Sequence, residues 1–210
     1  MELKKYLKPT DIIDCDSPSV RDKSRELTEG EKEAAGKAIS LFYFVRDAIR
    51  YNLYVSRSRP EHFQASRTLA NGHGYCVQKA VLLTALARAV DIPAALGFAR
   101  LRNHLLPEKT RAWLGTDILP FHGYTELYID GRWVKATPAF DAEMCRKYGI
   151  IPVDFDGKND GMFHSHNRDG KLRIEYLEDL GHHYDDLPLE KLQRALIETI
   201  GPGALEPPLR

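Results

Sequence analysis

The sequence predicts a single α+β domain, because helical patterns come first along the chain and strand patterns come later. Apolar side chains recur at helical spacing through residues 76–90 and predict a buried helix. In residues 121–137, apolar and polar side chains alternate before and after Asp130-Gly131, which predicts two strands joined by a tight turn, a β-hairpin. At 210 residues the chain has an ordinary length for one domain, spanning residues 1–210.

The first half of the chain carries most of the helix signals. Residues 1–16 show no regular period and predict a loose N-terminal segment. Ser17-Pro18 is a typical helix start and predicts a helix through Leu27. The segment from Thr28 to Glu31 resembles a capping box, which predicts a second helix ending near Arg50.

The remaining elements follow from shorter patterns. Gly72-His73-Gly74 predicts a turn directly before the buried helix, and residues 51–55 favour an extended segment. We expect strands at 94–100 and 171–177, a surface loop at 154–169, a helix at 187–200 and a frayed end at 201–210.

The bulk composition excludes several classes of function. The chain carries 30 basic and 30 acidic side chains, so it lacks the basic excess typical of nucleic-acid binding. No apolar run is long enough to span a membrane, and the start lacks the pattern of a secretory signal. Three widely spaced cysteines indicate neither a disulfide framework nor a zinc site, and favour the cytoplasm. Nothing in the sequence indicates an oligomeric state.

Cys76 is the strongest candidate for a catalytic residue. It directly follows the glycine turn and is the first residue of the predicted buried helix. A helix N-terminus favours the thiolate and offers N–H groups to an oxyanion. We therefore expect a Cys76 pKa below that of a free thiol. Cys15 and Cys145 lack this context and are interpreted as packing residues.

The hairpin supplies a candidate base. With the turn centred between Asp130 and Gly131, paired residue numbers sum to about 261, so His122 shares a sheet face with Thr137 and, if the strand continues, Asp141. A histidine with an oxygen partner can activate a cysteine nucleophile. The pattern predicts that His122 lies over the start of the cysteine helix.

Two segments together resemble the transglutaminase-like superfamily. They are SRTLANGHGYCVQKAVLLTALARAVDIPAALGFA, residues 66–99, and HGYTELYIDGRWVKATPAFD, residues 122–141. The resemblance implies a papain-like α+β fold, with Cys76 as nucleophile on a buried helix and His122 as base on an antiparallel sheet. It also implies acyl transfer through a thioester and a third residue, an aspartate, that orients the histidine.

The third position departs from the family pattern. The family places its aspartate before a proline, where this chain has Thr137. Two alternatives stay open: Asp141 supplies the carboxylate, which we favour, or Thr137 or a backbone carbonyl orients His122 with a neutral hydrogen bond.

The leading hypothesis is a cysteine enzyme that acts on a peptide or small amide-bearing substrate, with water preferred over an amine as acceptor. A non-enzymatic binding domain that keeps the fold is the alternative, for which the missing aspartate is the main argument. A third, weaker hypothesis is a metal site built from His164, His166, His182 and His183. We expect no cofactor, no metal, no nucleic acid and no membrane partner.

Overall fold

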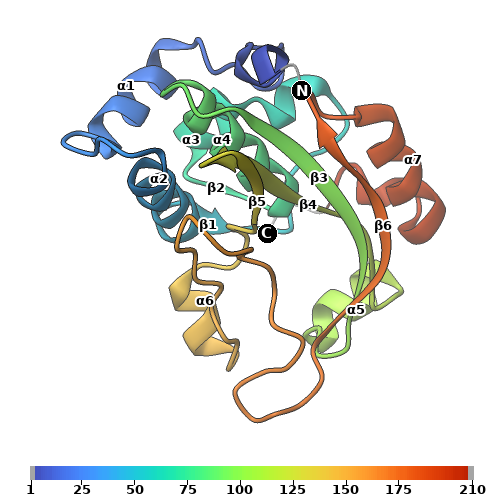
Figure 1. Cartoon of the computed structure of the whole chain (residues 1–210). Helices are drawn as coiled ribbons and strands as arrows, with labels where there is room; N and C mark the ends of the chain where they lie inside the picture. Colours follow the sequence, from blue (N-terminus) through green and yellow to red (C-terminus); the bar gives the residue numbers. More distant parts are fainter. Residues whose placement is uncertain (1–2, 208–210) are drawn as a thin grey trace.

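A curved four-stranded antiparallel sheet with strand order β5-β4-β3-β6 forms one layer of the fold, and helices surround it (Figure 1). The computed structural model describes residues 3–207. The helices are α1 Pro18–Leu27, α2 Ala34–Ala48, α3 Ala65–Asn71, α4 Cys76–Arg88, α5 Glu108–Leu114, α6 Ala142–Lys147 and α7 Leu189–Ile200. The strands are β1 Arg50–Tyr51, β2 His73–Gly74, β3 Ala94–Asn103, β4 Ile118–Ile129, β5 Arg132–Ala136 and β6 Ile174–Tyr184. The α+β prediction is confirmed.

Helix α4 is the centre of the core. All of its residues are buried, and it contacts α2, α3, β3 and β4. A helix that is apolar on every side must be covered on every side, as the sequence predicts. Its one lysine, Lys79, donates hydrogen bonds to the carbonyls of Arg46 at 3.0 Å and Ile49 at 2.5 Å, at the end of α2. The lysine thus joins the two helices.

The β4–β5 hairpin has the predicted register. Thr125 pairs with Ala136 and Ile129 pairs with Arg132, so each pair sums to 261. Asp130 and Gly131 have positive φ angles of 49° and 84°, as a tight two-residue hairpin turn requires. Strand β5 ends at Ala136, because Thr137 donates its N–H to the carbonyl of Gly161 instead of continuing the ladder.

A short parallel pair, β1 with β2, brings two distant segments together. Tyr51 pairs with Gly74, two residues before Cys76. A Cβ on Gly74 would lie 3.0 Å from the Cβ of Gln78, so this close approach favours glycine. Of the extended segment expected at 51–55, only Tyr51 lies in a strand, and that strand, β1, runs beside the residues just before α4.

The loose N-terminal segment was a wrong prediction for residues 3–16. Residues 3–7 form a short 3-10 helix, and Ile12 and Ile13 are buried in the core. The hydroxyl of Thr10 accepts the N–H of Ile13 at 2.8 Å and donates to Asp186 at 2.8 Å. Burial of the two isoleucines and the hydrogen bonds of Thr10 hold the segment in place. Neither produces a regular period in the sequence, so the sequence could not reveal this structure. Residues 1–2 lie outside the described part.

The predicted capping box at Thr28 is also wrong. Its hydroxyl donates to the carbonyl of Ser24 at 2.8 Å, which places Thr28 at the end of α1. Helix α2 starts later, at Ala34, after Glu33. Threonine bonds a preceding carbonyl as readily as a following N–H, so the same residue fits either helix end.

The C-terminal prediction is corrected in part. Residues 202–204 form a 3-10 turn, Ala204 is buried, and Leu205 accepts the N–H of Arg57 at 2.8 Å, so this stretch is not frayed. Residues 208–210 lie outside the described part. Strand β6 starts at Ile174 and extends beyond the predicted 171–177 range to Tyr184, because it pairs with β3 from Asn103 back to Leu96.

Candidate active site

Cys76 is the first residue of α4, as predicted. Gly72 adopts a left-handed conformation with φ of 65° and ends α3, which lets the chain turn into β2 and then into α4. The N–H of Tyr75 donates to the side-chain oxygen of Gln78 at 3.2 Å, and the Gln78 amide donates to the carbonyl of His62 at 2.6 Å. Gln78 therefore stabilises the helix start.

The start of α4 packs directly on β4 beside the candidate base. A Cβ added to Gly123 would lie 3.0 Å from the Cα of Val77. Gly123 follows His122 on β4. The absence of a side chain at Gly123 thus allows the helix backbone and the strand backbone to touch at Cys76-Val77. Strand β4, which carries His122, therefore packs on the start of α4, as predicted.

The Cys76 thiol is buried, with 7% of the residue exposed. Burial raises the thiol pKa above its ordinary value, while the backbone N–H of Gly123, the charge of Arg57 and the N–H of Val77 oppose that shift. The expected lowering of the Cys76 pKa is therefore wrong for this structure. The N–H groups are in place, but desolvation outweighs them.

His122 is covered by aromatic rings. The residue is 1% exposed, and its ring centroid lies 4.8 Å from that of Phe163. Phe163 in turn stacks on Phe140 at 4.7 Å and an interplanar angle of 19°. Burial lowers the His122 pKa to about 3, so the imidazole is neutral at pH 7.

The helix start and the strand of the candidate pair pack together, but the two side chains are not bonded to each other in the described structure. Side chains alternate along a strand, so Gly123 faces α4 while the His122 ring packs on Phe163. The Nε2 atom of His122 is buried without a hydrogen-bond partner, and within residues 3–207 no hydrogen bond joins the ring to the Cys76 thiol.

Asp141 and Thr137, the alternative third residues, bond elsewhere. The Asp141 carboxylate accepts the N–H groups of Met144 at 2.8 Å and Tyr51 at 3.0 Å, and so caps α6 and holds β1. The Thr137 hydroxyl lies 3.3 Å from the sulfur of Met162. Because β5 ends at Ala136, Asp141 is not on a continued strand, and in the described structure neither residue is bonded to His122.

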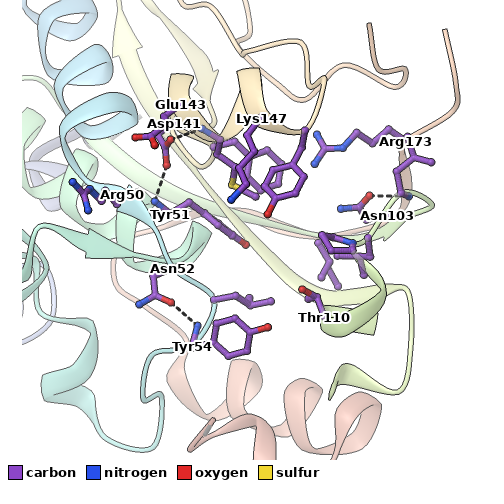
Figure 2. A pocket seen from close by; sticks show the side chains of 18 residues that line it. Arg50, Tyr51, Asn52, Tyr54, Asn103, Thr110, Asp141, Glu143, Lys147 and Arg173 are labelled. Carbon is purple, nitrogen blue, oxygen red and sulfur yellow. Dashed lines mark hydrogen bonds between the residues drawn. The ribbon is translucent and has the colours of Figure 1, made fainter. Parts of the chain in front are cut away.

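A cavity of about 560 Å³ lies next to this region (Figure 2). Tyr51, Phe140 and Asp141 form one part of its wall, and Arg173 and Asn103 form another. The Tyr51 and Phe140 rings are 4.9 Å apart, and burial raises the pKa of Tyr51 above its ordinary value, with a smaller contribution from the nearby Cys76. Tyr51 lines the cavity and pairs with Gly74, two residues before Cys76, while the cavity wall contains neither Cys76 nor His122.

The sequence did not single out Tyr51, Phe140, Phe163 or Arg173. Each reaches the site through contacts between distant segments, and none has a local motif. Glu126, part of the resembling segment, is buried and accepts the N–H of His183 at 2.7 Å. It fixes the end of β6 and does not touch the candidate pair.

The His182 and His183 rings lie 4.7 Å apart, but in the described part of the chain the histidines of the metal hypothesis do not gather into a site. Within residues 3–207, no three histidine, cysteine or acidic side chains form a group that could hold a metal ion. In the same range, every helix is too short or too polar to cross a lipid bilayer.

The family profile described as the transglutaminase-like superfamily matches residues 21–138, which include Cys76, His122 and the start of α4. The chain belongs to the transglutaminase-like superfamily. Membership confirms the resemblance and supports a cysteine-dependent function of the peptidase or acyltransferase type in general. A search of curated proteins found no match.

Two solved structures are similar to this transglutaminase-like chain. One, provisionally described as a cysteine protease from Cytophaga hutchinsonii, is 17% identical, with a TM-score of 0.49 over 87% of this chain and 54% of that one. The other, provisionally described as a protease from Parabacteroides distasonis, is 13% identical, with a TM-score of 0.42 over 60% of this chain and 26% of that one. The chain therefore spans about half the length of the first of these proteins and about a quarter of the second.

Proposed function

We propose that this protein is a cysteine-dependent enzyme that hydrolyses an amide bond through a thioester, with Cys76 as nucleophile and His122 as base. The observation that carries the proposal is the contact between the start of α4 and Gly123, which puts a cysteine at a helix N-terminus beside a strand histidine. The substrate class is a peptide or a small amide.

The chemistry assigns one role to each group. His122 takes the thiol proton while the Cys76 sulfur bonds to the carbonyl carbon, and N–H groups at the helix start hold the oxyanion. The C–N bond then breaks, and the amine leaves with the proton from His122. Water adds to the thioester with help from His122, the C–S bond breaks, and a carboxylic acid and the free thiol are released.

For these reaction steps, the His122 ring has to turn from Phe163 towards the Cys76 thiol. Asp141 as the orienting carboxylate stays a proposal, with Thr137 or a backbone carbonyl as its alternative. Water is the preferred acceptor, because the sequence carries no second-substrate motif and no calcium loop. Cys15, Cys76 and Cys145 are all free thiols, which supports our proposal of a reducing, cytoplasmic setting.

The second candidate is a binding domain without catalysis. It is favoured by the burial of both Cys76 and His122, which keeps thiol and imidazole neutral, and by the lack of a group bonded to His122 within residues 3–207.

Labelling with iodoacetamide, read by peptide mass spectrometry, separates the two candidates. If the protein is an enzyme, Cys76 should react about tenfold or more faster than Cys15 and Cys145. Cys15 and Cys145 serve as internal controls, because they too are buried thiols with raised pKa values. His122→Asn should remove the advantage of Cys76. Equal, slow labelling of all three cysteines would favour the binding domain.

A further inference from the structure

Arg173 is a buried cation without a counter-ion. The residue is 6% exposed, lies just before β6 and lines the cavity. Its guanidinium lies over the Phe140 ring, 4.8 Å from the centroid, and Figure 2 shows it directed towards the middle of the cavity. Among the described residues, no carboxylate or carbonyl accepts a hydrogen bond from the guanidinium.

The other buried charge in the cavity does not neutralise Arg173. Asp141 already accepts two N–H groups, at the opposite part of the wall (Figure 2). The remaining charged lining residues, Arg50, Glu143 and Lys147, are exposed. Burial lowers the pKa of Arg173 to about 10, and it therefore remains charged at neutral pH. An unpaired buried charge is costly, so an anion that reaches it gains strong, charge-assisted hydrogen bonds.

Neighbouring groups complete a site for a planar anion. Asn103 is buried beside Arg173, and its oxygen accepts the N–H of Leu105 at 3.2 Å, which leaves its amide donors for a ligand. Thr110 adds a hydroxyl to the same region of the wall. The flat guanidinium, held on the Phe140 ring, matches the two oxygens of a carboxylate better than a lysine could.

The same cavity leads towards the candidate nucleophile. Its apolar wall includes Leu106 and Leu119, and it also includes Tyr51, which pairs with Gly74 two residues before Cys76. A ligand with its carboxylate on Arg173 would extend along apolar surface towards the start of α4.

We propose that Arg173 is a specificity residue that binds a carboxylate of the substrate, as in the C-terminal residue of a peptide, while Asn103 supplies a second donor. The assignment of this cavity to the substrate rests on the proposed function. The anion site itself rests on the unpaired guanidinium and the cavity.

The test uses Cys76→Ala, which cannot turn over substrate, so that binding is measured whether or not the protein is an enzyme. The probes are N-acetylleucine and N-acetylphenylalanine, each compared with its uncharged amide by isothermal calorimetry. At least one acid should bind about tenfold or more tightly than its amide. Arg173→Gln should abolish the preference, and Arg173→Lys should restore part of it.

Lys147→Gln is the matched control, because Lys147 is an exposed cation that lines the same cavity and should leave the preference unchanged. If Arg173→Gln does not fold, the acid-dependent rise in melting temperature of the parent chain and of Arg173→Lys decides the matter. Equal binding of acids and amides, a preference that survives Arg173→Gln, or no binding of either acid at about 10 mM would each overturn the proposal. Selective labelling of Cys76 in any of these cases would leave the enzyme proposal intact.

Discussion

At the scale of single residues, His122 is a titratable group kept neutral by its surroundings. The sequence predicted both Cys76 at a helix start and His122 on a strand, since each depends on a local pattern. It could not predict that Phe163 covers the imidazole, because that contact comes from a loop with no periodicity. The prediction of a lowered Cys76 pKa was wrong for the same reason, because the burial of the thiol depends on the whole fold.

The buried His122 should make the protein sensitive to acid. Its pKa falls from 6.5 to about 3 on folding, so between these values the unfolded chain binds one proton more than the folded one. Stability is then complete above pH 6.5 and decreases as the pH falls towards 3. From pH 6.5 to 4.5, His122 should contribute a loss of about 2 kcal/mol in the free energy of unfolding.

Urea unfolding at pH 7 and at pH 4.5 measures this loss, with His122→Asn as the variant that cannot titrate. Carboxylates titrate in both proteins and cancel in the comparison. The loss on acidification should be smaller in His122→Asn, and equal losses would show that His122 is not buried in its neutral form.

At the scale of elements, Asp141 organises two of them. It caps α6 through Met144 and holds the end of β1 through Tyr51. An aspartate at the start of a short helix is a familiar cap, so α6 could have been predicted from the sequence. The bond to Tyr51 could not, since it joins segments with no shared pattern. The β4–β5 hairpin was predicted to its register because its turn is entirely local.

Asp141→Ala should lower the free energy of unfolding by about 1–3 kcal/mol, because it removes the cap of α6 and leaves the Tyr51 N–H without its acceptor. Asp141→Asn keeps one acceptor oxygen and should recover part of the loss. Thr137→Ala is the control and should cost less, since among the described residues its hydroxyl bonds only to the weakly accepting sulfur of Met162. Chemical denaturation of the three variants decides this, and an unchanged stability of Asp141→Ala would contradict the capping role.

At the scale of the whole molecule, one buried arginine joins distant parts of the chain. Arg88, at the end of α4, donates to the carbonyls of Lys8 at 2.6 Å, Ala94 at 3.0 Å and Asp185 at 2.8 Å. The N-terminal segment, β3 and the end of β6 thus meet at a single side chain. Sequence patterns place an arginine in the last helical turn but cannot indicate which carbonyls it reaches.

Arg88→Met should destabilise the protein by about 3 kcal/mol or more, because the change leaves buried carbonyls unpaired while keeping most of the apolar volume. Hydrogen exchange should show the loss first in residues 3–16 and in the end of β6. Arg21→Met, on exposed surface, is the comparison and should have little effect. A global loss with no preference for those segments would contradict the joining role.

The pairing of β6 with β3 also sets the order in which the chain can fold. Strands β3 and β4 are near neighbours in sequence and can pair early, whereas β6 begins only at Ile174. Contacts between distant segments form slowly, and an unpaired strand edge readily joins other chains. Until β6 pairs with it, the free edge of β3 is thus the part of a partly synthesised chain at which aggregation is expected to start. Arg173 directly precedes β6, so the proposed anion site is completed only when that last strand docks.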